Sequence, residues 1–322
     1  MNAGPKVLVT GANGFVGRVV CRELLVRDCS VVAAVRDAGN HGTEGLVGNI
    51  RTVVTGDLRQ AFDWGAALSG VEFVIHLAAR VHQMSGMQDS DAEYHAVNAE
   101  ATRQLALAAA AAGVRRFVFL SSVKVCGERA AGHIFNEQDG GTGLDAYARS
   151  KWEAEQMLWR IARDSGLEVV IVRTPLVYGP GVRANFLRMM QWVARGIPLP
   201  LAGVDNRRSL IYVDNLADAL IACGIHAAAA GKTFLVSDGV DVSTPDLLRM
   251  LAQALGTGSR LWHCPLFLLR GVAMLAGKSA EIDRLLGSLQ VSTAAIHGTL
   301  GWVPPHSMRE GLQKTAQWYW SR

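Results

Sequence analysis

Short apolar runs rich in valine and isoleucine recur along the first half of the chain and alternate with longer stretches of helical periodicity. One such stretch, residues 99–112, is rich in alanine and stops at Gly113, a residue type that favours the left-handed end of a helix. Alternating strands and helices predict βαβ crossovers. We therefore expect an α/β fold, a Rossmann-type doubly wound parallel sheet. Its six expected strands span residues 7–10, 31–35, 52–55, 73–77, 117–121 and 169–172.

The alternation stops after residue 172. Residues 173–181 are rich in proline and glycine, and a helical stretch follows to about residue 195. A last helical stretch, residues 308–319, indicates a helix that returns to close the fold. We predict a Rossmann domain over residues 1–175, which also carries the catalytic residues, and a smaller lobe over residues 176–322 with segments that return to the first domain.

One apolar stretch, residues 261–276, needs separate treatment. It is interrupted by His263, Pro265 and Arg270, and it is too short to cross a bilayer. We expect it to form a buried or partner-facing helix, with peripheral contact to a membrane as the alternative. No membrane span is predicted.

Composition narrows the class of protein. Of the 322 residues, 50% are hydrophobic and 19% are charged, which excludes a disordered chain. The net charge of +4 is scattered, which disfavours nucleic acid as a partner and allows a small anionic substrate. The five cysteines show no C-x-x-C spacing, so neither a disulfide framework nor a metal site is expected. With no secretion signal at the start, we expect a cytoplasmic protein.

The first expected strand leads into three glycines, Gly11, Gly14 and Gly17, and then into an amphipathic helix. Glycines here permit a tight turn and let the backbone approach a pyrophosphate, while the helix N-terminus offers N–H groups and a positive dipole end. Because the three glycines stand between the first strand and the first helix, their spacing is a strong indication of phosphate binding. We predict a dinucleotide site at this turn.

The end of the second strand bears on the choice of dinucleotide. Val35 stands where an acidic residue would bind the ribose 2′-hydroxyl of NAD, and Arg36 follows it. A guanidinium there can pair with a 2′-phosphate, which favours NADP(H) over NAD(H). The alternative is that Arg36 is a solvated charge and Asp37 contacts the ribose. Asp57 is expected near the adenine, and residues 77–79 near the adenosine ribose and pyrophosphate.

Tyr147 and Lys151 are spaced by four on a predicted helix, so both side chains can point into one cleft. A nearby ammonium lowers the pKa of a phenol and makes it a usable proton carrier. Ser122 ends a predicted strand, at the edge where active sites of parallel sheets collect. We predict Ser122, Tyr147 and Lys151 as the catalytic residues, with the serine on the reacting carbonyl oxygen.

With these motifs the chain resembles the extended short-chain dehydrogenase/reductase family, the NAD-dependent epimerase/dehydratase group that modifies nucleotide sugars. A homodimer is typical of that family. The resemblance covers nearly the whole length, through residues 11–17, 57, 76–79, 97–98, 117–122, 147, 151, 177–181, 208–214 and 300–302. Together with the residues above, it gives these expected cofactor contacts: Gly11, Asn13, Gly14, Phe15, Val16, Gly17, Arg36, Asp57, Leu58, Leu77, Ala78, Ala79, Asn98, Tyr147, Lys151, Pro175 and Val177.

The resemblance also implies a UDP-sugar substrate. Arg208, which precedes an apolar strand, is similar to the arginine that binds the substrate diphosphate, and Asn185 is similar to a residue that meets the nucleotide phosphates. Arg284 is expected to add to this site. The alternative for Arg208 is a surface charge. The full set of expected substrate contacts is Ser122, Tyr147, Asn185, Arg208 and Arg284.

Departures from the family pattern reduce the number of family reactions that this chain is expected to catalyse. Dehydratases carry an acidic pair after the serine or threonine, whereas Val123 and Lys124 stand here. Leu176 occupies the place of an asparagine common in UDP-glucose 4-epimerases. The chain is most similar to bacterial reductases of 4-keto sugar nucleotides for surface polysaccharides, and we expect reduction at C4 of a UDP-4-keto-6-deoxy-N-acetylhexosamine. The alternatives are a UDP-hexose 4-epimerase, a non-catalytic NADP(H) sensor and a reductase of neutral ketones, the last disfavoured by Arg208.

Overall fold

A computed structural model describes residues 4–37, 48–81, 91–128, 132–275, 282 and 285–322. Its centre is a seven-stranded, wholly parallel sheet in the order β3-β2-β1-β4-β5-β6-β9. The first six strands of this order are those of a Rossmann fold, so the predicted fold class is confirmed. The strands are β1 (Lys6–Thr10), β2 (Ser30–Val35), β3 (Ile50–Val54), β4 (Phe73–His76), β5 (Arg116–Ser122), β6 (Glu168–Thr174) and β9 (Lys232–Leu235).

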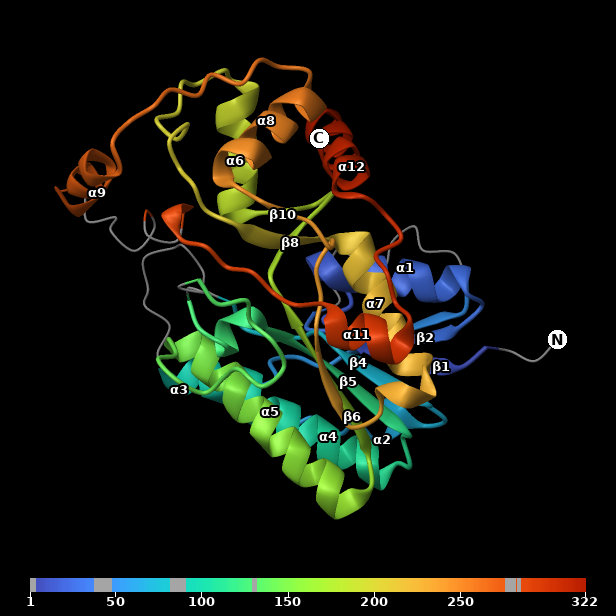
Figure 1. The fold of residues 1–322 in the computed structure, drawn as a ribbon. Helices are drawn as coiled ribbons and strands as arrows, with labels where there is room; N and C mark the ends of the chain where they lie inside the picture. The colour runs from blue at the N-terminus through green and yellow to red at the C-terminus, as the bar shows by residue number, and fades with distance from the viewer. Residues whose placement is uncertain (1–3, 38–47, 82–90, 129–131, 276–281, 283–284) are drawn as a thin grey trace.

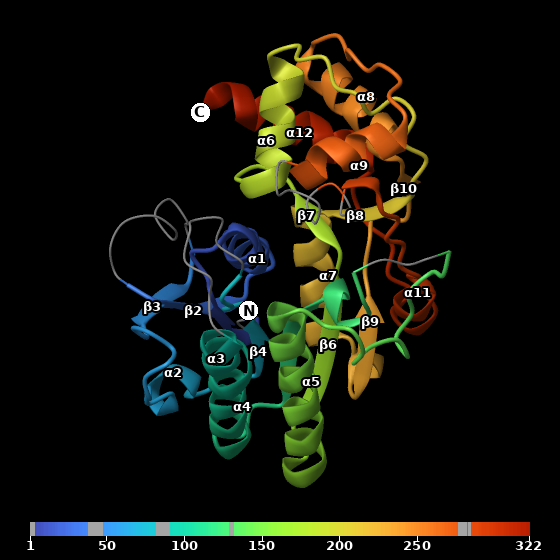
Figure 2. The same ribbon diagram turned by 90° about the vertical axis from the view of Figure 1, so that its left-hand side faces the viewer.

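Helices cover both faces of this sheet (Figures 1 and 2). On one face α1 (Phe15–Val26) packs against α7 (Val213–Ile225), and on the other α4 (Ala101–Ala111) packs against α5 (Ala146–Ser165). Burial on both sides explains why the strands read as continuous apolar runs rather than as alternating ones. Residues of β1, β4, β5 and β6 are almost completely buried.

The six strands expected from the sequence all form, with ends within two residues of the predicted ones. Short helices were less predictable. The helix expected from residue 99 begins instead as α3 (Asp91–Tyr94), continues as a π-helix (His95–Glu100) and only then becomes α4. Other short pieces are α2 (Gly65–Leu68) and two 3₁₀ turns, Val123–Val125 and Ala227–Ala229.

A second layer of structure stands above the carboxyl edge of the large sheet (Figure 2). It contains a three-stranded sheet in the order β10-β8-β7, in which β7 and β8 are parallel and β10 is antiparallel to β8. Between these strands the chain returns to the large sheet through α7 and β9. Its elements are β7 (Leu176–Tyr178), β8 (Arg208–Tyr212), β10 (Asp241–Val242), α6 (Ala184–Ala194), α8 (Thr244–Leu255), α9 (Leu266–Leu275) and α12 (Met308–Ser321). Helix α11 (Ala294–Leu300) lies instead against β9 of the large sheet.

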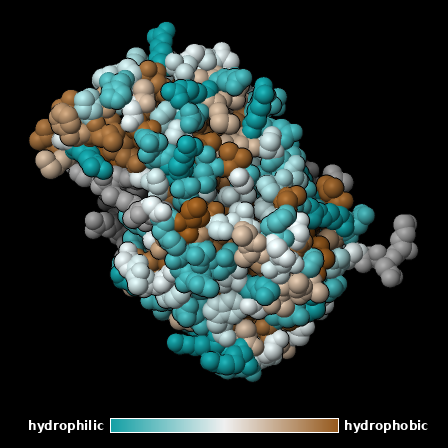
Figure 3. All heavy atoms as spheres, viewed as in Figure 1, coloured by the Kyte–Doolittle hydropathy of each residue, from teal (hydrophilic) through white to brown (hydrophobic). Residues whose placement is uncertain are grey.

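The apolar stretch around residue 270 forms α9; of the two expected arrangements, burial is wrong, and a partner-facing helix stays a prediction. Leu269 packs on the core, but Phe267 and Leu275 are 72% and 88% exposed, because α9 stands out from the second layer (Figure 1). Figure 3 shows the resulting hydrophobic patch at the upper left of the molecule. No helix among the described residues is long and apolar enough to cross a membrane.

Candidate active site

The glycine turn after β1 has the geometry that a dinucleotide requires. Gly11 has a φ of +63°, and a Cβ on Gly17 would lie 2.1 Å from the carbonyl oxygen of Gly11, so larger residues would push α1 off the strand. The N-cap of α1 is Gly14, which provides no side-chain hydrogen bond to the first turn. The N–H groups of that turn are therefore left for a pyrophosphate.

A cavity of about 410 Å³ lies beside this turn at the carboxyl edge of the sheet. The predicted cofactor residues that line it are Gly11, Asn13, Gly14, Arg36, Asp57, Leu58, Leu77, Ala78 and Ala79. Trp64, Arg59 and Arg80, which the sequence analysis missed, line it too. The lining combines small residues that expose backbone, apolar side chains and guanidinium groups, which fits an adenosine and its phosphates.

Asp57 and Arg36 both line this cavity, and their side chains differ in how firmly they are held. Arg59 Nε donates to Asp57 Oδ2 at 2.8 Å, and this hydrogen bond lowers the pKa of Asp57 to about 2. Arg36 is mostly exposed and its Nε lies 3.4 Å from Asp37 Oδ2. Asp57 therefore keeps its negative charge and its orientation, whereas the Arg36 guanidinium is free to turn toward an anion.

The loop after β4 is held in place by hydrogen bonds to Thr10 at the end of β1. Thr10 Oγ1 accepts hydrogen bonds from the N–H groups of Leu77 and Ala78, each at 3.1 Å. His76 is buried between Thr10 and Thr102, and burial lowers its pKa to about 3, so it is a neutral packing residue. In the sequence, the sign of this role is that Thr10 is a polar residue at the end of the apolar run of β1.

Asn98, expected to contact the cofactor, lies buried in the π-helix. Its amide nitrogen donates to Arg80 O and to Ser150 Oγ, and its Oδ1 accepts from Arg80 N at 2.7 Å. It therefore ties the wall of the cavity to α5. The expected contacts at Phe15, Val16, Pro175 and Val177 lie outside the 410 Å³ cavity and stay predictions.

The three predicted catalytic residues meet at the carboxyl edge of β5. Asp145 caps α5 by accepting from Ala148 N at 2.8 Å, which places Tyr147 in the first turn of the helix. Ser122 is the last residue of β5 and shares a hydrogen bond with the Tyr147 hydroxyl. One turn further along α5, Lys151 is buried, and its Nζ donates to Leu120 O at 2.8 Å.

Burial dominates the protonation of this group. It raises the pKa of Tyr147 to about 12 against the hydrogen bond with Ser122, and it lowers the pKa of Lys151 to about 7 against the charge of Glu155. Tyr147 is therefore held as a phenol, the form that can donate a proton. Lys151 stands 4.4 Å from the centroid of the Phe119 ring, which stabilises its charged form.

A buried ion pair fixes the helix that carries Tyr147 against the sheet. Arg173 Nη2 on β6 lies 2.7 Å from Glu155 Oε2 on α5, and both side chains are almost fully buried. Ser121 Oγ donates to Glu155 Oε1 at 2.5 Å, and Arg173 Nη1 donates to Asp139 O at 2.6 Å. The sequence analysis missed this pair because its members are 18 residues apart on different elements.

Lys124 follows the catalytic serine where dehydratases carry an acid. Its Nζ lies 2.6 Å from Asp145 Oδ2 and 5.8 Å from the centroid of the Tyr147 ring. A lysine paired in this way supplies positive charge beside the phenol and has no carboxyl group to protonate a leaving hydroxyl.

Besides Ser122 and Tyr147, the residues expected to bind the substrate lie in the second layer or outside the described residues. Asn185 is exposed in the first turn of α6, and Arg208 begins β8, where its Nη1 donates to Gly287 O at 3.0 Å. Burial lowers the pKa of Arg208. Arg284 lies outside the described residues.

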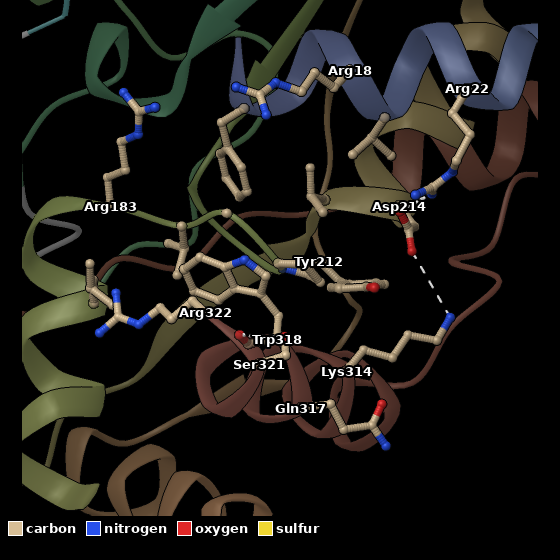
Figure 4. A pocket seen from close by; sticks show the side chains of 17 residues that line it. Arg18, Arg22, Arg183, Tyr212, Asp214, Lys314, Gln317, Trp318, Ser321 and Arg322 are labelled. Atoms are coloured by element: carbon tan, nitrogen blue, oxygen red, sulfur yellow. Dashed lines mark hydrogen bonds and ion pairs between the residues drawn. The ribbon is translucent and has the colours of Figure 1, made fainter. Parts of the chain in front are cut away.

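A larger cavity, of about 960 Å³, opens between α1 and α12 (Figure 4). Among its lining residues Asp214 is the single acid, and it already pairs with Arg22 at 2.7 Å and with Lys314 at 4.0 Å. The Arg322 guanidinium lies 5.6 Å from the centroid of a Trp318 ring, and Arg18 and Arg183 line the cavity across from it. This excess of positive charge favours an anion there, and no motif in the sequence indicated it.

Among the described residues, no group of three or more His, Cys, Asp or Glu side chains could hold a metal ion. At the edge of the sheet, Tyr147, Lys151 and Ser122 bring together a phenol, an ammonium and a hydroxyl.

Comparisons with known proteins extend over nearly the whole chain. The model of the NAD dependent epimerase/dehydratase family matches residues 7–237. UDP-glucose 4-epimerase of Vibrio cholerae is 42% identical over 318 residues, which cover 97% of this chain and 94% of that protein. The 2-alkyl-3-oxoalkanoate reductase of Stenotrophomonas maltophilia is 30% identical and covers 96% and 98%. The solved structure of MoeE5 in complex with UDP-glucose and NAD is similar with a TM-score of 0.77, at 27% identity over 99% of both chains.

Proposed function

Because this chain belongs to the NAD dependent epimerase/dehydratase family, we propose that it reduces the C4 carbonyl of a UDP-4-keto-6-deoxy-N-acetylhexosamine. It is an NAD(P)-dependent enzyme of the short-chain dehydrogenase/reductase type, so the alternative of a non-catalytic sensor is set aside. What we propose beyond the enzyme class is the identity of the substrate and the direction of the reaction.

The observation that carries the proposal is the meeting of Tyr147, Ser122 and Lys151 at the sheet edge beside the glycine turn. When bound, the nicotinamide supplies the hydride. Ser122 orients the carbonyl oxygen by hydrogen bonding, and Tyr147 donates its phenolic proton to that oxygen as negative charge develops. A phenol whose pKa is raised to about 12 is fully protonated at neutral pH, which suits donation in the direction of reduction.

Two further residues support reduction over the other family reactions. Lys124 takes the place of an acid that dehydration would need, and it lies beside Tyr147. Leu176 at the start of β7 is 45% exposed, and an apolar side chain there suits a 6-deoxy sugar better than one with an additional hydroxyl. The proposed diphosphate contacts are Asn185, Arg208 and Arg284.

For the cofactor we propose NADP(H), although solved relatives of the family bind NAD. Arg36 lines the adenosine cavity, its guanidinium is mostly exposed, and Val35 provides no carboxylate for a ribose hydroxyl. A 2′-phosphate can pair with that guanidinium.

Arg36→Ala is expected to raise the KM for NADPH by about tenfold, the effect of one charge-assisted contact of about 1.4 kcal/mol, and to leave the KM for NADH unchanged. Steady-state kinetics with both cofactors measure this. Arg59→Ala serves as the control, because Arg59 is engaged by Asp57. Equal effects on the two cofactors would show that Arg36 does not read the 2′-phosphate.

A UDP-hexose 4-epimerase is the second candidate, and the 42% identity to UDP-glucose 4-epimerase of Vibrio cholerae favours it. Both reactions use the same phenol, lysine and serine. An epimerase removes a hydride and returns it to the opposite face of C4, so it retains its cofactor and consumes none.

The test is the fate of the nicotinamide. The purified protein is dialysed and assayed for retained cofactor, and then mixed with NADPH and a UDP-4-keto-6-deoxy-N-acetylhexosamine. Stoichiometric oxidation of NADPH is expected. Retained NAD, no net oxidation and interconversion of UDP-glucose with UDP-galactose, or of their N-acetyl forms, would replace the reductase by the epimerase.

The buried Lys151 predicts a pH dependence of stability in the cofactor-free protein. Burial lowers its pKa to about 7 from 10.5, so between these values the unfolded chain binds more protons than the folded chain. The free energy of unfolding therefore rises with pH across this window, by up to about 1.4 kcal/mol per unit. Urea titrations from pH 7 to 10 should show this slope in wild type and its loss in Lys151→Met. Parallel curves would refute it.

Two expectations remain proposals: the division of function at residue 175 and a homodimer formed by the helices that contain Ala99 and Trp152.

A further inference from the structure

The most exposed apolar surface of the described chain is on α9. Of its large hydrophobic side chains, Phe267 is 72% exposed, Met274 69% and Leu275 88%, and Trp262 just before the helix is 51% exposed. Together with Leu268 these residues define the α9 patch, the brown area at the upper left of Figure 3. Soluble proteins seldom expose so many large apolar side chains side by side.

The exposure follows helical spacing. Phe267, Gly271 and Met274 recur at intervals of four and three, and Leu268 and Leu275 are seven apart, so they lie along one face of α9. Leu269, outside this spacing, packs against the core of the second layer. The helix is thus anchored on one side and presents an apolar stripe on the other.

The segments next to α9 are rich in arginine. Residues 183–204 contain Arg183, Arg188 and Arg195 and no Asp or Glu, and residues 250–275 contain Arg260 and Arg270 and no Asp or Glu. Backbone hydrogen bonds join the two stretches: Leu199 N donates to Arg260 O at 2.9 Å, and Trp262 N donates to Leu199 O at 3.1 Å.

We propose that the α9 patch docks on an anionic phospholipid bilayer, with α9 lying in the interface. An apolar face with aromatic residues, next to two arginine-containing segments without Asp or Glu, matches anionic head groups above an acyl layer. Ten residues of helix reach about 15 Å, which suits lying on a bilayer and not crossing it. A second copy of this chain matches less well, because it would bring another basic surface against this one.

The position of α9 gives this docking a consequence for the enzyme. Figures 1 and 2 both place α9 on the side of the molecule on which α5 begins. A bilayer under α9 therefore faces the same side as Tyr147.

The test is flotation of the purified full chain with vesicles of phosphatidylglycerol and phosphatidylethanolamine, compared with vesicles of phosphatidylcholine alone. The protein is expected to float with the anionic vesicles only, and less so as salt increases. Met274→Asp/Leu275→Asp should lower the partition coefficient by at least about tenfold. The matched control is Val26→Asp/Val303→Asp, two valines that are 73% and 59% exposed elsewhere. The control should float like the wild type.

Arg260→Glu supplies a second variant that leaves the apolar face intact, and its partition coefficient should fall by about fivefold or more. Thermal unfolding checks that each variant is folded. Absence of flotation, or equal flotation with both kinds of vesicle, overturns the proposal. So does a dimer in sedimentation that dissociates in Met274→Asp/Leu275→Asp without lipid, because then a second copy covers the patch. None of these readouts depends on which sugar the enzyme reduces.

Discussion

Tyr147→Phe is expected to lower kcat by about 10²–10⁴-fold, because the substitution removes the proton donor and little else. The Tyr147 side chain is half-buried at the start of α5 and its hydroxyl partner is Ser122, so phenylalanine fills the same space. Rates are measured as NADPH oxidation with the 4-keto substrate. The dissociation constant of the cofactor should change little, because the turn at Gly11 and the adenosine cavity are untouched.

Tyr319→Phe is the control, since Tyr319 lies on α12, away from the sheet edge. It should retain the wild-type kcat. If Tyr147→Phe kept more than about a tenth of the activity, another group would have to deliver the proton, and Lys124, 5.8 Å from the ring, would be the first to examine.

Glu155→Gln is expected to reduce the free energy of unfolding by about 3–5 kcal/mol, the usual effect of leaving one partner of a buried ion pair without its counter-charge. Arg173 would keep its charge in a nearly water-free position, with the Asp139 carbonyl and a neutral amide in place of the carboxylate. The measurement is urea unfolding at constant pH.

Asp164→Asn on the same helix gives the comparison. The pair of Arg163 and Asp164 is exposed, with side chains 75% and 72% accessible, so its loss should change stability by less than about 1 kcal/mol. Similar losses for Glu155→Gln and Asp164→Asn would mean that water reaches the buried pair and that it does not fix α5.

Local patterns in the sequence were sufficient to predict the first six strands of the large sheet. Valine-rich runs gave β1 to β6, and the Gly11, Gly14 and Gly17 turn and the Tyr147 helix start where strand and helix chemistry place them. These features depend on residues that are neighbours along the chain, and periodicity reports such neighbours well.

Contacts between distant segments were not predictable in the same way. The pair of Arg173 and Glu155, the cations around Trp318, and the position of α9 each depend on how separate elements meet. An apolar helix has the same sequence pattern whether its face meets the core, a partner or solvent, so the sequence predicts either a buried or a partner-facing helix around residue 270, and burial is wrong.

The route of the chain limits how substrate preference can be exchanged between relatives. After β6 the chain builds β7, α6 and β8, returns through α7 and β9 to the large sheet, and leaves again for β10 and α8. A chimera joined once, at residue 175, would bring foreign α7 and β9 against the native α1 and β6. Transplanting a sugar specificity therefore requires at least two separate inserts, one before α7 and one after β9, with the packing of α1 on α7 left native.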